Sequence, residues 1–141
     1  MSGNPIRPPL GVGDIVLRMA IVALTLATAF IHLTLGGELF TLNAAGYVVW
    51  AAALVVPLAI AVRYRWLIRI GLAGYAATTI AAWAIDPIFF STAYLAKGIE
   101  LAVIGLLAVD FARRDGNPIE RIPHEIRSLL ARPHGSASGR A

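Results

Sequence analysis

Long apolar stretches dominate the chain, and short polar segments separate them. Four such stretches run over about 15–35, 44–62, 66–85 and 92–111. A helix needs about 20 mostly apolar residues to cross the ~30 Å hydrocarbon core of a bilayer. Each stretch is about that long, so the pattern predicts an all-α, polytopic membrane protein with a bundle of four transmembrane helices.

Composition supports a small protein made mostly of membrane-embedded segments. Of 141 residues, 58% are hydrophobic and 14% are charged, whereas a soluble domain has about 25% charged residues. The chain has no cysteine, which excludes disulfides, iron–sulfur clusters and thiolate zinc sites. We expect an extended tail over 1–13, a transmembrane domain over 14–112 and a second tail over 113–141.

Arginines mark one side of the membrane. The first tail, the loop between the second and third stretches, and the last tail are basic, whereas the loops 36–43 and 86–91 contain neither Lys nor Arg. The positive-inside rule therefore predicts cytoplasmic termini in a multi-pass protein of the cell inner (plasma) membrane. The arginines expected to contact lipid headgroups are Arg63, Arg65, Arg113 and Arg114. This placement favours the lipid bilayer as a partner over nucleic acid, despite the net charge of +4.

Helix ends can be expected at a few small or polar residues. Asp14 and Asn43 are suited to begin the first two helices as N-caps, and Gly36-Gly37 is suited to end the first. Pro57 lies inside the second apolar stretch, where it removes one backbone hydrogen bond and should kink the helix.

The last tail has the pattern of a short amphipathic helix over about 118–131. Its apolar residues recur at helical spacing, at Ile119, Ile122, Ile126, Leu129 and Leu130. Such a helix lies on the membrane surface or docks onto a partner subunit, and the sequence leaves both interpretations open.

Two opposite charges lie inside the fourth stretch. Lys97 and Glu100 are three residues apart and so share a helix face. Counted along the helix, they lie roughly 8 and 12 Å below the outer edge of the membrane. Exposing either charge to lipid costs about 2.5–3.5 kcal/mol. Three interpretations follow. The pair is a self-neutralising structural pair; or it forms a site for a proton, a cation or a polar ligand; or it pairs with a charge on another subunit.

A histidine lies near the outer end of the first stretch. Thr25 and Thr28 precede His32 by seven and four residues, which gives one helix face a polar stripe. In an antiparallel bundle this stripe can meet Lys97 and Glu100, and a Glu–His–Lys cluster can relay protons. The alternative is a histidine that simply hydrogen-bonds a carbonyl or a threonine.

Other polar groups carry weaker expectations. A haem bound to His32 would be shared with another subunit or have a single protein ligand, because His124 and His134 lie in the tail. Thr78 adds hydrogen-bonding capacity within the third stretch, beside the small residues Gly71 and Gly74, which favour close helix packing. Charged residues near the cytoplasmic ends are expected to extend to the headgroups; they are Arg18, Arg69 and Asp110.

No catalytic or metal-binding motif is present in the sequence, and the sequence identifies no cofactor. We therefore expect a non-catalytic accessory or anchoring subunit of a larger membrane complex, with other membrane subunits as partners. A small oligomeric transporter or channel that uses Glu100, Lys97 and His32 is the alternative. A redox subunit that contacts a quinone or a haem is the third interpretation.

Overall fold

The computed structural model describes residues 11–87 and 91–114. Over these residues the chain is all-helical, with the helices α1 Val12–Leu35, α2 Glu38–Val55, α3 Ala59–Arg63, α4 Arg65–Ile85 and α5 Ser91–Arg114. The expected helix over 118–131 and its docking residues lie outside the described residues.

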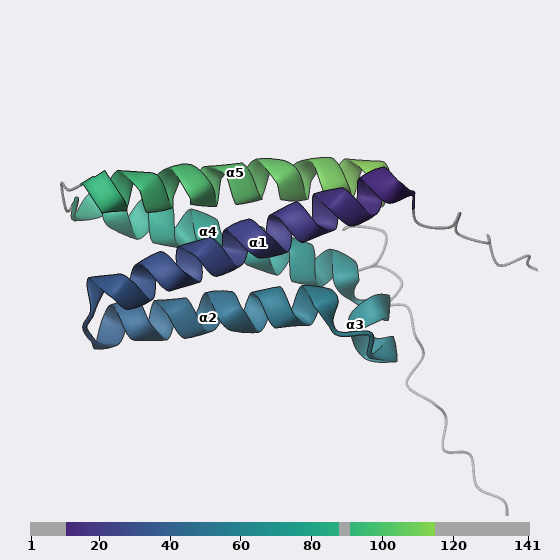
Figure 1. The fold of residues 1–141 in the computed structure, drawn as a ribbon, viewed down its shortest axis with the longest axis horizontal. Helices are drawn as coiled ribbons and strands as arrows, with labels where there is room; N and C mark the ends of the chain where they lie inside the picture. The colour runs from purple at the N-terminus through teal and green to yellow at the C-terminus, as the bar shows by residue number, and fades with distance from the viewer. Residues whose placement is uncertain (1–10, 88–90, 115–141) are drawn as a thin grey trace, which may run out of the picture.

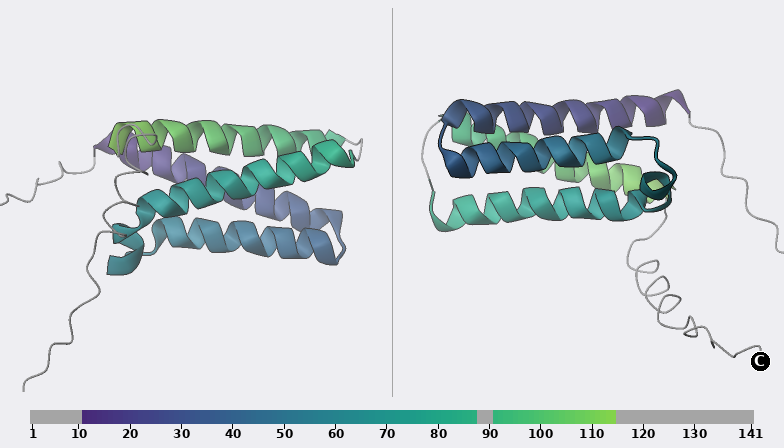
Figure 2. Two further views of the ribbon diagram at one scale, coloured as in Figure 1. Left: turned by 180° about the vertical axis from the view of Figure 1, so that it is seen from behind. Right: turned by 90° about the horizontal axis from the view of Figure 1, so that it is seen from below.

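The four long helices form an antiparallel bundle (Figure 1). Helix α1 packs against α2 and α5, and α4 packs against α5, with fewer contacts between α2 and α4. The start of α1 and the end of α5 lie at the same end of the bundle. Figure 2 shows that the short helix α3 lies at this end too, beside the start of α4.

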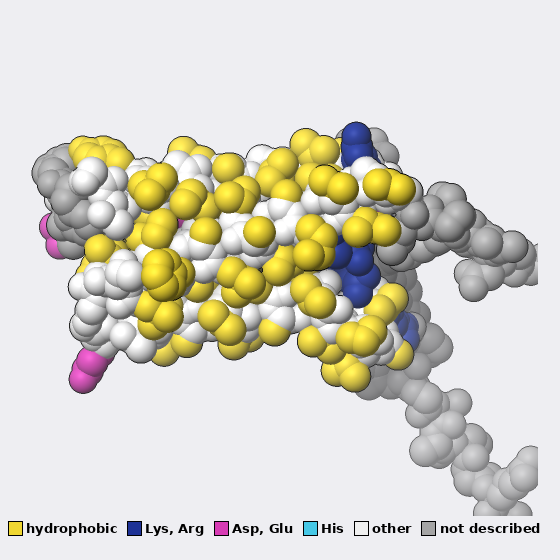
Figure 3. Space-filling model, viewed as in Figure 1, with side chains coloured by type: hydrophobic (Ala, Val, Ile, Leu, Met, Phe, Trp, Pro, Cys, Tyr) yellow, Lys and Arg dark blue, Asp and Glu magenta, His cyan; other side chains and the backbone are white. Residues whose placement is uncertain are grey.

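Three helices of the bundle are long and apolar enough to cross a membrane: α1, α2 and α4. Hydrophobic side chains cover much of the face shown in Figure 3, over α1, α2 and α5. Over the described residues the chain is thus a helical protein with three candidate membrane spans. Helix α5 is also 24 residues long and carries Lys97, Glu100 and Asp110.

The core follows one buried stripe on α1 and another on α5. Alternating steps of three and four residues keep such a stripe on one helix face. On α1 the buried stripe passes through Ile21, Thr25, Thr28 and His32. On α5 it passes through Glu100, Val103, Leu107 and Asp110. Both stripes therefore carry polar groups at buried positions, along with apolar residues.

The sequence predicts one kinked helix over the second apolar stretch, and this prediction is wrong. The structure has two separate helices there, α2 and α3. Helix α2 ends at Val55, and Val56 takes an extended conformation with ψ 126°. Proline lacks an N–H and forces the preceding residue out of the helical region. Pro57 therefore ends α2, and a separate helix, α3, follows it.

The turn between α1 and α2 forms where it was predicted. Gly36 and Gly37 have φ values of 71° and 85°, a left-handed conformation that glycine adopts without strain. Helix α2 begins directly afterwards at Glu38, so the prediction that Asn43 caps it is wrong. The N-cap of α1 is Gly11 rather than Asp14, and the Gly11 N–H donates to Asp14 Oδ2 at 3.3 Å.

Two glycines allow aromatic rings to pack closely between α2 and α4. A methyl group at Gly71 would overlap the Trp50 ring, and one at Gly46 would overlap the Tyr75 phenol. Gly74 has open space around it. The predicted small-residue stripe of α4 thus makes close contact at Gly71 and not at Gly74.

Candidate functional site

The three ionisable residues expected to meet inside the bundle do come together. Lys97 Nζ donates to Glu100 Oε2 at 2.7 Å and to the Thr79 carbonyl of α4 at 3.2 Å. His32 Nε2 of α1 lies 3.8 Å from Glu100 Oε1. The exposed fraction is 0% for Glu100 and 3% for His32. We call His32, Lys97 and Glu100 the central cluster.

Hydrogen bonding fixes how His32 presents its ring. Its Nδ1 lies 2.8 Å from the Thr28 carbonyl, and a carbonyl can only accept, so Nδ1 carries a hydrogen. Nε2 is therefore the nitrogen that gains or loses a proton, and it faces Glu100 Oε1. Glu100 Oε1 is buried and has no hydrogen-bond partner. At 3.8 Å, one small movement or one water is enough to bridge the two atoms.

Aromatic side chains surround the central cluster. The His32 ring packs against Tyr47 and Phe40, with ring centroids 5.6 and 6.1 Å away. The Tyr47 hydroxyl lies 2.9 Å from Thr79 Oγ1. A carboxylate in such surroundings is shielded from bulk water, so its interactions with nearby charges are strong.

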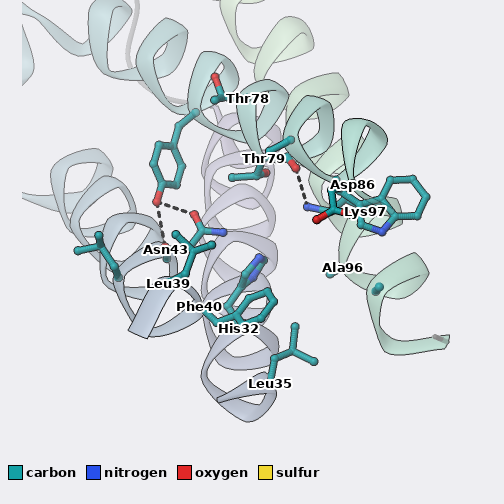
Figure 4. Close-up of a pocket in the computed structure, with 15 residues that line it drawn as sticks. His32, Leu35, Leu39, Phe40, Asn43, Thr78, Thr79, Asp86, Ala96 and Lys97 are labelled. Carbon is teal, nitrogen blue, oxygen red and sulfur yellow. Dashed lines mark hydrogen bonds between the residues drawn. The ribbon is translucent and has the colours of Figure 1, made fainter. Parts of the chain in front are cut away.

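A pocket of about 410 Å³ lies beside the central cluster (Figure 4). All four long helices line it, at the end of the bundle where α1 meets α2. His32 and Lys97 are part of the lining. On another wall the Tyr75 hydroxyl donates to Asn43 Oδ1 at 2.6 Å, which joins α4 to α2. Small-molecule pockets have volumes of about 300–1,000 Å³, so this pocket is large enough for a small ligand.

The candidates Thr28 and Thr78 are placed differently. Thr28 is fully buried, and its hydroxyl has no hydrogen-bond partner; its carbonyl holds His32. Thr78 is exposed and lines the pocket, and its hydroxyl donates to the Gly74 carbonyl at 2.8 Å. Thr28 therefore positions the histidine, whereas Thr78 belongs to the pocket wall.

An apolar layer separates the central cluster from the far end of the bundle. It consists of Ile21, Leu72, Val103 and Leu107, which are all buried in one hydrophobic core. Val103 and Leu107 lie between Glu100 and Asp110 along α5. Ten residues of helix span about 15 Å, so charged groups lie on both sides of this apolar layer.

The end of the bundle beyond this layer holds a second group of charges, which we call the end cluster. It comprises Asp14, Arg18, Arg65, Arg69, Asp110 and Arg114. Arg69 Nε lies 2.7 Å from Asp110 Oδ2. Arg114 pairs with Asp110 Oδ1 at 3.1 Å and with Asp14 Oδ2 at 3.2 Å.

The expectation that Arg69 and Asp110 extend to the headgroups is wrong. Their exposed fractions are 4% and 2%, because each finds its opposite charge inside the bundle. Arg114, expected at the lipid headgroups, is also held in ion pairs. One sequence pattern could have indicated the end cluster. Charged residues recur at a spacing of four, which puts both members of a pair on one helix face; the pairs are Asp14/Arg18, Arg65/Arg69 and Asp110/Arg114.

Arg65, also expected at the lipid headgroups, belongs to the end cluster, whereas the remaining two, Arg63 and Arg113, have exposed positions. Arg63 lies over the Tyr64 ring, 5.5 Å from its centroid, and Arg113 is exposed on the last turn of α5. Neither takes part in the ion pairs of the end cluster.

Known proteins give no further guide to the site. No protein-family model matches the chain, and the searches of curated proteins and of solved structures found no match. Within residues 11–87 and 91–114, no group of three or more His, Cys, Asp or Glu side chains is arranged to hold a metal ion. The features that bear on function are therefore the central cluster and the pocket.

Proposed function

We propose that the chain crosses the plasma membrane four times, with α5 as the fourth span and both termini in the cytoplasm. Lys97, Glu100 and Asp110 prevent α5 from facing lipid on all sides, but each is paired within the bundle. Pairing removes most of the penalty for charge in a membrane. The basic residues gather at the end where α1 begins (Figure 3), which is the cytoplasmic end by the positive-inside rule.

Single cysteines test this topology, because the chain has none of its own. A membrane-impermeant thiol reagent added to intact cells should label Glu38→Cys and leave Arg63→Cys unlabelled. Permeabilised cells should label both. The opposite labelling pattern contradicts the orientation, and labelling of both variants in intact cells contradicts the span count.

For function, we propose a small transporter or channel in which His32 and Glu100 exchange protons. The observation that carries this proposal is the fully buried Glu100, whose unpartnered Oε1 faces His32 Nε2 at 3.8 Å. Ionisable groups buried in a membrane bundle beside a cavity are typical of proton relays in transporters. An ion pair with a purely structural role would need only Lys97 as the partner of Glu100, and not His32 as well.

Protonation of Glu100 also changes the pocket. Because His32 lines the pocket, a proton can enter at Nε2 and pass to Glu100 Oε1. Neutral Glu100 then holds Lys97 less strongly. Lys97 also lines the pocket, so its ammonium group becomes available to a ligand that carries a hydrogen-bond acceptor. Proton uptake and ligand binding are thereby coupled through one ion pair.

Proton flux into proteoliposomes tests the proposal. With a pH gradient and a clamped potential, an internal pH dye should report faster acidification with the wild type than with protein-free vesicles. Glu100→Gln and His32→Gln should reduce the flux to the protein-free level. Glu38→Gln, which removes an exposed acid at the same end, should leave it unchanged. Equal flux from the wild type and Glu100→Gln contradicts the proposal.

The other two interpretations have less support from the geometry. The accessory-subunit interpretation depends on the tail over 113–141, and it stays a prediction. A haem iron at His32 Nε2 would compete with Glu100 for that nitrogen. A quinone would fit the pocket volume, and solvent extraction of the purified protein followed by an ultraviolet spectrum would reveal it.

A further inference from the structure

The end cluster has more positive charge than negative charge. It contains four arginines and only two aspartates. The three helices α1, α4 and α5 each contribute one pair of residues four positions apart. This surplus of two positive charges lies at the edge of the apolar bundle and not in a solvated loop.

The ion pairs of the end cluster use both aspartates and leave two arginines without a carboxylate partner. Asp110 pairs with Arg69 and Arg114, and Asp14 pairs with Arg114. Among the described residues, Arg18 and Arg65 form no ion pair. The Arg65 Nε is buried and has no hydrogen-bond partner. A buried guanidinium N–H without an acceptor is costly, because it has lost water and gained nothing.

The surplus arginines also repel one another. Arg18 interacts unfavourably with Arg65, Arg114 and Arg69, and Asp110 provides the opposing attraction. Arg65 is likewise close to Arg69 and Arg114. Helix α2 ends at Val55 and the chain turns away into α3, so α2 does not continue alongside this end of the bundle. Dark blue side chains are visible there between α1 and α3 (Figure 3).

A bound anion would offset the surplus positive charge of the end cluster and would accept hydrogen bonds from the guanidinium groups that have no partner. A guanidinium binds phosphate through two parallel hydrogen bonds. Basic pockets between helices on the cytoplasmic side of a membrane are typical sites for anionic headgroups. We propose that Arg18 and Arg65 together bind one phosphate-type anion, and that the phosphodiester of an anionic membrane lipid supplies it. This site is separate from the central cluster and does not depend on its function.

Lipid retention by the full-length protein tests this proposal. The purified chain is equilibrated with an equal mixture of phosphatidylglycerol and phosphatidylcholine, and bound lipids are counted by native mass spectrometry. Phosphatidylcholine carries the same phosphodiester together with a choline cation, which the surplus positive charge of the end cluster repels. The net negative charge of phosphatidylglycerol beside two arginines should therefore give it a preference of about 30-fold. Arg18→Gln/Arg65→Gln should lose that preference. Arg63→Gln/Arg113→Gln, which removes the same charge from exposed positions, should keep it.

A lysine double variant and a competition with inorganic phosphate complete the test. The lysine variant controls for misfolding, and the competition identifies the source of the anion. Arg18→Lys/Arg65→Lys keeps the charge without the planar fork, and it should retain part of the preference. Displacement of the lipid by inorganic phosphate would support the site and make a free anion its natural occupant. An equal loss of preference in both glutamine double variants, or no preference in the wild type, overturns the proposal.

The chain's own acidic residues in the last tail are the remaining alternative. The triple variant Asp115→Asn/Glu120→Gln/Glu125→Gln removes them. If it gains lipid binding that the wild type lacks, those residues occupy the site and the proposal is wrong. If its lipid preference equals that of the wild type, the proposal stands.

Discussion

Glu100→Gln should destabilise the bundle, because it leaves Lys97 without its counter-charge. The Lys97 side chain is 12% exposed and the Glu100 side chain 0%. Removing one partner of a buried ion pair costs about 3–5 kcal/mol. Lys97 keeps its bond to the Thr79 carbonyl and some exposure, so we expect the lower end, about 3 kcal/mol. Equilibrium unfolding by a denaturing detergent in mixed micelles, followed by tryptophan fluorescence, measures this loss.

A double-mutant cycle separates the ion pair from other effects of the substitution. Lys97→Met and the double variant Lys97→Met/Glu100→Gln complete the cycle. We expect the double variant to be clearly more stable than the sum of the single losses predicts, because no unpaired charge remains. Single losses that add to within about 0.5 kcal/mol would show no coupling and refute the reasoning. Glu38→Gln, at an exposed position, should leave stability unchanged.

Substitutions elsewhere should show how tightly the bundle is packed and how much the Asp110 ion pair contributes to its stability. Gly71→Ala should lower the free energy of unfolding by about 1–3 kcal/mol, since the new methyl group overlaps Trp50. Gly74→Ala, measured by the same detergent unfolding titration, should be neutral or stabilising. Asp110→Asn should cost about 3 kcal/mol, because it removes the carboxylate that pairs with Arg69, and a loss below about 0.5 kcal/mol would contradict that pairing.

Periodicity along the chain predicted the long helices and indicated that His32 can meet Glu100, which was one of two interpretations that the sequence left open. Both depend on local spacing: an apolar run of about 20 residues predicts a helix, and steps of three and four residues put polar groups on one face. The antiparallel order then brings two such faces together. Composition could not reveal that Glu100 Oε1 lacks a hydrogen-bond partner, because that depends on distances across the bundle.

The α2 boundaries and the end cluster were harder to predict from the sequence. Pro57 was recognised as a perturbation, but sequence alone does not decide between a kinked helix and a broken one. Arg69 and Asp110 look like residues that extend to the headgroups when each is considered on its own helix. Their burial follows from a partner on another helix, which is a tertiary effect. The pocket likewise depends on how the four long helices pack at one end of the bundle.

One measurement tests most directly whether the pocket leads to a proton-exchange site. Thr78→Cys places a single thiol on the exposed pocket wall, and Glu38→Cys places one outside the pocket at the same end. Vesicles with each variant are assayed for proton flux before and after labelling with a membrane-impermeant reagent from the outer side. We predict that labelling reduces the flux of Thr78→Cys to the protein-free level and leaves that of Glu38→Cys unchanged. Unchanged flux through fully labelled Thr78→Cys would contradict the pathway.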